Sequence, residues 1–234
     1  MVSGEMYNQF SKLTNYLDLR EVNEQLAEEN RNLHDRQLKS FEKLYGPNVL
    51  INDTIYQQQY FYTKARIVNN STNKQNNYLT LNVGKANGIE SGMGVISSNG
   101  VVGIIRNVSE HYSTVLSMLH RSTKISVKLK NNNYFGSMQW DGKSYKEGVL
   151  MDIPNHVQIS KGDTIITSGF SATFPANIPV ATIKSFEKPE GENFYNIHLN
   201  FTTHFKNISY VYVIKNNWAN EQVELEKKTK DENG

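Results

Sequence analysis

Few residues in this chain have a type and spacing that would support catalysis. Gly162-Asp163-Thr164 resembles the Gly-Asp-Ser-Gly sequence around a serine-protease nucleophile, but threonine replaces serine and Ile165 replaces the glycine of the oxyanion hole. A catalytic triad also needs a histidine that is hydrogen-bonded to a carboxylate. No histidine has a recognisable catalytic context; the six are His34, His111, His120, His156, His198 and His204. We therefore expect no enzymatic activity.

The sequence also lacks patterns that bind metals or cofactors. There is no cysteine, which excludes disulfides, thiolate nucleophiles and cysteine metal sites. No HExxH motif, calcium loop or phosphate loop is present. The closely spaced Gly84, Gly88, Gly92 and Gly94 lie in a turn and at a strand start, and no helix follows them. We expect neither a metal nor a cofactor.

Composition limits the class of protein further. The chain has 234 residues, which suffices for one large domain or two small ones, and 38% of them are hydrophobic. The net charge is only +2, which argues against nucleic acid as a partner. There is no run of 18 apolar residues that would span a membrane, and no signal peptide is visible.

Residues 7–45 are predicted to form one long helix that mediates dimerisation. Leucines recur every seven residues, with asparagines in the alternate seam position, a pattern typical of a parallel coiled coil. The helix would be on the order of 55 Å long, too long to pack along one small domain. A single amphipathic helix is the alternative. The predicted dimerisation residues are Leu19, Asn23, Leu26, Asn30 and Leu33.

Gly46-Pro47 is predicted to end this helix, and residues 46–60 to form a connector. From residue 61 the apolar period changes to two, as in Ile125, Val127 and Leu129, which indicates half-buried strands. The chain is therefore predicted to be mostly β, with short strands in a sandwich or barrel. The predicted strands are 61–68, 78–83, 93–97, 101–108, 113–119, 124–130, 134–140, 147–152, 163–167, 179–187, 193–201 and 208–214. The polar segment 216–234 is predicted to be a disordered tail.

The loop after strand 163–167 is the strongest candidate for a partner-binding site. Glycine and proline shape its backbone, and it has no titratable group between Asp163 and Lys184. Such a loop cannot supply a general acid or base, but it can present rigid apolar contacts. Phe174 is the first choice of anchor and Phe170 the second, beside Pro175 and Pro179. The alternative is that both phenylalanines plug the end of a barrel.

The same loop carries a resemblance to a known family. Residues 162–180 read GDTIITSGFSATFPANIPV, which is similar to the signature GD-x-V-x-TSG…FP-x-G-x-PVG of the rod shape-determining MreC family. Asn177 and Ala181 stand where that family usually has glycine. Further similar segments follow in the family's order: Ala65-Arg66-Ile67-Val68, Leu79 to Lys85, Asn87-Gly88-Ile89, Gly92 to Ile96, Asn99 to Gly103 and Ser113 to Leu116.

The resemblance implies two six-stranded β-barrels arranged like the halves of a chymotrypsin-like protease. A faint internal repeat agrees with it, and the barrels are placed at 61–120 and 121–215, with a crossover of the chain between them left open. The family has one transmembrane helix before the coiled coil. Since the helix here begins almost at Met1, we expect this membrane anchor to be missing from the sequence.

The implied function is a non-enzymatic scaffold of the bacterial cell-elongation complex, on the periplasmic side of the inner membrane. Such a scaffold would form homodimers, with growth into filaments left open, and would bind and activate the class B penicillin-binding transpeptidase. MreD, RodA and MreB are the further partners that the resemblance implies. Two alternatives remain: a protease-like cell-wall hydrolase, and a stalked β-barrel module that binds saccharides.

Overall fold

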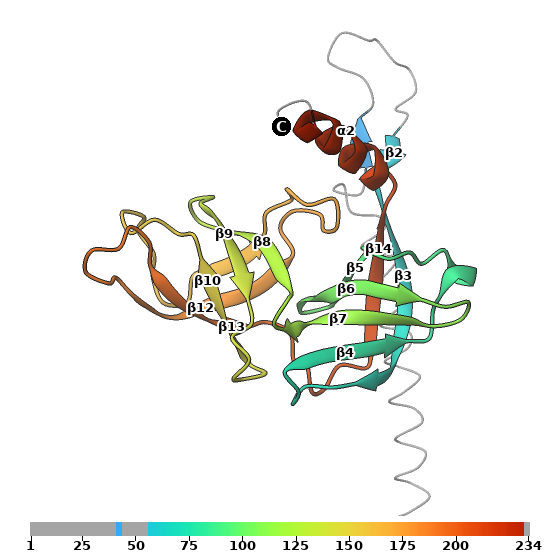
Figure 1. Ribbon diagram of the computed structural model, residues 1–234, viewed down its shortest axis with the longest axis horizontal. Helices are drawn as coiled ribbons and strands as arrows, with labels where there is room; N and C mark the ends of the chain where they lie inside the picture. The colour runs from blue at the N-terminus through green and yellow to red at the C-terminus, as the bar shows by residue number, and fades with distance from the viewer. Residues whose placement is uncertain (1–40, 44–55, 232–234) are drawn as a thin grey trace, which may run out of the picture.

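The computed structural model describes residues 41–43 and 56–231. In this part the protein is mostly β: two closed barrels of six strands each lie against one another, and a helix follows the last strand (Figure 1). The prediction of a mostly-β chain with two six-stranded barrels is confirmed. The coiled-coil residues Leu19, Asn23, Leu26, Asn30 and Leu33 lie outside the described residues, and their pairing stays a prediction.

The first barrel is built from β3 (Tyr60–Asn70), β4 (Asn76–Leu81), β5 (Gly94–Ser97), β6 (Gly100–Val108), β7 (Ser113–His120) and β14 (Tyr210–Asn216). Its strands follow the order β14-β3-β4-β7-β6-β5, and every neighbouring pair is antiparallel. A 3-10 turn at Lys85–Asn87 precedes β5. Because β14 pairs with both β3 and β5, the last strand of the chain closes the barrel.

The second barrel is built from β8 (Lys124–Leu129), β9 (Phe135–Gln139), β10 (Glu147–Met151), β11 (Thr164–Thr167), β12 (Pro179–Glu187) and β13 (Asn196–Phe201), in the order β10-β13-β12-β11-β8-β9. It is therefore inserted between two strands of the first barrel. The predicted division into 61–120 and 121–215 differs at its end, because strand 210–216 belongs to the first barrel. The chain does cross between the barrels, because β14 returns to pair with β3 and β5 of the first barrel. No local sequence pattern reveals this pairing.

Alternating burial explains how these strands form the two cores. In β8, Ile125, Val127 and Leu129 are buried, and Lys124 and Ser126 are exposed. Side chains on a strand point alternately to its two faces, so one face fills the barrel and the other meets solvent. In the first barrel β4 shows the same alternation, and its Leu79 and Leu81 are fully buried.

The boundaries predicted at the N-terminal end of the described region are wrong. Phe41–Lys43 form strand β1, paired with β2 (Tyr56–Gln58), so the helix expected over 7–45 does not include these residues and the connector expected over 46–60 contains a strand. A non-local strand pair leaves no trace in a heptad pattern.

The C-terminal segment, predicted to be disordered, contains helix α2 (Ala219–Asp231). Its glutamates, lysines and single glutamine favour helix without needing a core. Gln222 and Glu226, one turn apart, share a hydrogen bond of 2.9 Å. Among the described residues, no helix is long and apolar enough to cross a membrane.

Candidate interaction surface

The loop between β11 and β12 is held by hydrogen bonds to its own ends. The Thr167 hydroxyl donates to the carbonyl of Pro175 at 2.7 Å and accepts from the N–H of Ile178 at 2.9 Å. Asn177 has a φ of 71°, in the left-handed region. Asparagine tolerates this region better than most residues. The asparagine that replaces the family's glycine therefore adopts a conformation that glycine would also allow.

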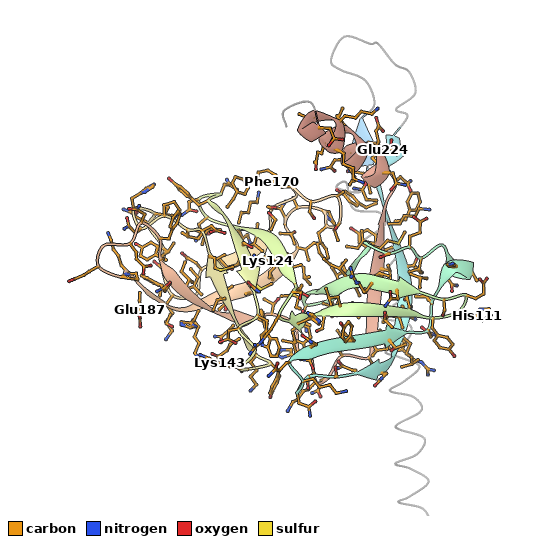
Figure 2. All side chains as sticks on the ribbon, viewed as in Figure 1. His111, Lys124, Lys143, Phe170, Glu187 and Glu224 are labelled. Atoms are coloured by element: carbon orange, nitrogen blue, oxygen red, sulfur yellow. The ribbon has the colours of Figure 1, made fainter. Side chains whose placement is uncertain are left out.

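Phe170 is the exposed aromatic residue of this loop. Its side chain is 61% exposed, and its ring lies 4.2 Å, centroid to centroid, from the ring of Phe135 on β9, which is 44% exposed. Figure 2 labels Phe170 at the outer edge of the second barrel. The N–H of Phe170 donates to the Ser168 hydroxyl at 3.1 Å, and that hydroxyl is 2.8 Å from the hydroxyl of Ser126 on β8. We call Phe135 and Phe170 the aromatic pair.

Phe174 has the opposite environment. Its side chain is 2% exposed and packs against Gly94 of the first barrel: a methyl group at Gly94 would lie 2.6 Å from Cε1 of Phe174. Phe174, the first choice of exposed anchor, thus fits the alternative of a plug, although it fills the junction of the barrels and not the end of one. Pro175 is also buried, whereas Pro179 is exposed.

A hollow of about 540 Å³ lies beside the aromatic pair, at the junction of the two barrels. Its lining includes Ile104 from the first barrel, and Ile125, Phe135 and Thr173 from the second. Both barrels therefore line the hollow beside Phe135. Apolar and aromatic groups with a polar rim are typical of protein-binding surfaces.

Two of the groups considered for catalysis, Asp163 and His120, have structural hydrogen bonds. The Asp163 carboxylate accepts a hydrogen bond from the N–H of Ser160 at 2.8 Å, which caps the turn between these two residues. It also accepts one from the side-chain amide of Asn131 at 3.1 Å. His120 accepts the N–H of Ser122 at Nδ1 and lies 3.1 Å from the Tyr78 hydroxyl at Nε2. Burial, and to a lesser degree the nearby Arg106, lower the pKa of His120 below its usual value. His34 lies outside the described residues.

Metal ligands do not cluster in the described part of the chain. Within residues 41–43 and 56–231, no three histidine, aspartate or glutamate side chains gather closely enough to hold an ion. The lining of the hollow contains a single carboxylate, that of Asp152.

A family model described as "Rod shape-determining protein MreC, barrel core" matches residues 67–215. This stretch contains nearly all of both barrels, including the loop with Phe170 and Phe174, and it exceeds half of the chain. The chain belongs to the MreC family. The resemblance seen in the glycine and proline pattern is thereby confirmed.

Individual MreC proteins match over parts of their length. The chain is 29% identical to the cell shape-determining protein MreC of Haemophilus influenzae over 57% of this chain and 37% of the relative. For MreC of Listeria monocytogenes the identity is 26% over 72% of this chain and 57% of the relative. The chain thus spans between about a third and just over half of these relatives.

Solved MreC structures share the fold. MreC from Listeria monocytogenes has a TM-score of 0.63 at 21% identity, over 91% of this chain and 96% of that chain. MreC from Helicobacter pylori, solved in a complex with Penicillin-Binding Protein (PBP2), has a TM-score of 0.55 at 20% identity, over 68% of this chain and 99% of that chain.

The sequence did not identify three residues that contribute to this surface. Phe135 lies in a predicted strand, and no sequence feature indicates that its ring contacts Phe170. Gly94 belongs to the Gly-Met-Gly segment, which had indicated only a strand start, and Asn216 had been placed in the tail. Each matters because of a contact with a residue at least 35 positions away, so local spacing holds no signal for it.

Proposed function

We propose that this chain is a non-enzymatic scaffold of the bacterial cell-elongation complex and that it binds the class B penicillin-binding transpeptidase. The observation that carries the proposal is the aromatic pair of a two-barrel MreC core, in which Phe170 is exposed on a braced loop and Phe135 on strand β9. The MreC of Helicobacter pylori, which has this fold, is found in a complex with PBP2. We place the contact at Phe170 and Phe135, with Pro179 at the rim.

The physical reason is that a braced aromatic loop binds at a low entropic cost. Aromatic side chains are enriched in interfaces, and a pre-ordered loop has little freedom to lose on association. Binding would activate the transpeptidase only if one of its conformations fits this surface better than another, because a ligand shifts an equilibrium by its differential affinity alone. The scaffold thus acts by selecting an active conformation.

The wider setting of the proposal comes from the family. The chain would face the periplasm, and the full-length protein would be held at the inner membrane by one transmembrane helix. The predicted coiled coil would pair two chains, and MreD, RodA and MreB would be further partners. The coiled coil gives reach, and the barrels give binding surfaces.

The experiment is an affinity measurement with the purified periplasmic part of the transpeptidase from the same organism. Phe170→Ala and Phe135→Ala should each weaken binding about tenfold or more, as expected for an aromatic anchor, and leave the melting temperature unchanged. Phe194→Ala is the matched control, because Phe194 is 49% exposed on the same barrel but belongs to another loop. Wild-type affinity for both aromatic-pair variants would remove this surface from the proposal. Absence of any binding by the wild type would contradict the transpeptidase as partner.

A further inference from the structure

The loop that carries Phe170 is held by both barrels, although it belongs to the second. Its first residues rest on the second barrel, through the Ser168–Ser126 hydrogen bond and the Phe170–Phe135 ring contact. Its next residues, 172–174, contact the first barrel. The exposed ring therefore lies between two anchoring points on different barrels.

Gly94 of β5 provides the first contact with the first barrel. A methyl group at this position would lie 2.6 Å from Cε1 of Phe174 and 2.6 Å from the carbonyl oxygen of Thr173. Real side chains do not approach a backbone oxygen this closely, so any residue larger than glycine would push the loop away. Glycine is required here for space, and its φ is not among the positive ones.

Asn216, the last residue of β14, provides the second contact. Its side-chain amide nitrogen donates to the carbonyl of Ala172 at 3.0 Å. Its side-chain oxygen accepts the N–H of Trp218, also at 3.0 Å, so the amide is oriented by its own chain. Strand β14, which closes the first barrel, is thus also hydrogen-bonded to the loop between β11 and β12 of the second barrel.

We infer that Gly94 and Asn216 are positioning residues, through which the first barrel holds the loop in the conformation that presents Phe170 to a partner. Neither residue belongs to the aromatic pair. The surface is then a property of the docked pair of barrels, and a shift of one barrel against the other would loosen it. The inference rests on the proposed function only for its effect on binding, since the order of the loop can be measured alone.

The test compares Asn216→Ala with Asn155→Ala in the full chain by hydrogen exchange. Asn155 is the matched control, because its side-chain amide likewise donates to a loop carbonyl, that of Glu192, at 2.6 Å. Asn216→Ala should speed exchange of the 168–178 segment about three- to tenfold, as expected for one lost hydrogen bond. Exchange in β8 and β10 should stay unchanged. Asn155→Ala should leave the 168–178 segment unaffected.

Affinity for the transpeptidase then separates positioning from a merely structural role. Asn216→Ala should weaken binding about three- to tenfold while the chain stays folded, and Gly94→Ala should weaken it more if it folds. Unchanged exchange in Asn216→Ala would overturn the inference. Faster exchange with wild-type affinity would overturn it too, provided that Phe170→Ala does weaken binding. If Phe170→Ala binds like the wild type, the proposed contact fails, and the exchange result still decides whether the first barrel orders the loop.

Discussion

Phe170 and Phe174 show how two residues of one type, four positions apart, take opposite roles. Phe174→Ala should lower the free energy of unfolding by about 3–5 kcal/mol, because it leaves a cavity at the junction of the barrels. Phe170→Ala should change it by less than about 1 kcal/mol, since the ring is mostly in solvent. Urea unfolding of both variants measures the difference. Equal losses of stability would contradict the assignment of one buried and one exposed ring.

The sequence could not rank these two residues. Both lie among glycine, serine, alanine and proline, and neither belongs to a strand with alternating polarity. What distinguishes them is a distant contact, because Phe174 packs against Gly94, 80 residues earlier in the sequence. The loop itself was found from its own residues, because glycine and proline act locally.

His120 makes the stability of the first barrel depend on pH. Its side chain is buried, and burial followed by the charge of Arg106 lowers its pKa from the usual 6.5. The unfolded chain therefore takes up this proton more readily than the folded one. The contribution of His120 to stability is complete above pH 6.5 and is lost as the pH falls below 6.5 toward the lowered pKa.

The change from pH 7.5 to 5.5 should thus destabilise the wild type more than a His120→Gln variant. Protonation at Nδ1 would also remove the acceptor for the N–H of Ser122. Chemical unfolding at both pH values gives the two differences, and the variant subtracts the effect of the other histidines. An identical pH dependence in both proteins would mean that His120 is not the group responsible.

At the scale of elements, the strands were predictable and their partners were not. The strand expected at 124–130 is observed at 124–129, and that expected at 179–187 has the same bounds. Alternating apolar and polar side chains indicate a strand, whichever strand it pairs with. The strand expected at 208–214 was also found, at 210–216, but its place between β3 and β5 depends on residues more than 110 positions away.

Helix α2 should contribute little to the stability of the barrels. Most of its described side chains are exposed, with Leu225 at 66%. A chain that ends at Trp218 should melt within about 2 °C of the wild type, since 1 kcal/mol corresponds to roughly 2–4 °C at this size. A chain that ends at Ser209 is the contrast, because it also lacks β14 and should lose the first barrel. A drop above about 5 °C for the chain that ends at Trp218 would show that α2 packs on the barrels.

At the scale of the whole molecule, the predicted coiled coil would set the number of chains that assemble. The combined change Leu26→Asp and Leu33→Asp would place charges in the predicted apolar seam and should convert a dimer to a monomer. Light scattering at micromolar concentration measures the mass of both proteins. The barrels are separate from residues 26 and 33 in the sequence, so their melting should not change. A wild-type protein that is already monomeric would refute the predicted dimer.

The return of β14 to the first barrel also sets an order of events during synthesis. Strand β7 ends at His120, but β14 ends at Asn216, 96 residues later. At about 5–20 residues per second, the ribosome needs on the order of 5–20 s to add this stretch. In that interval β3 and β5 have unpaired edges, which are prone to pair with other chains. The second barrel has all its strands before the first can close, so the barrel that begins first is completed last.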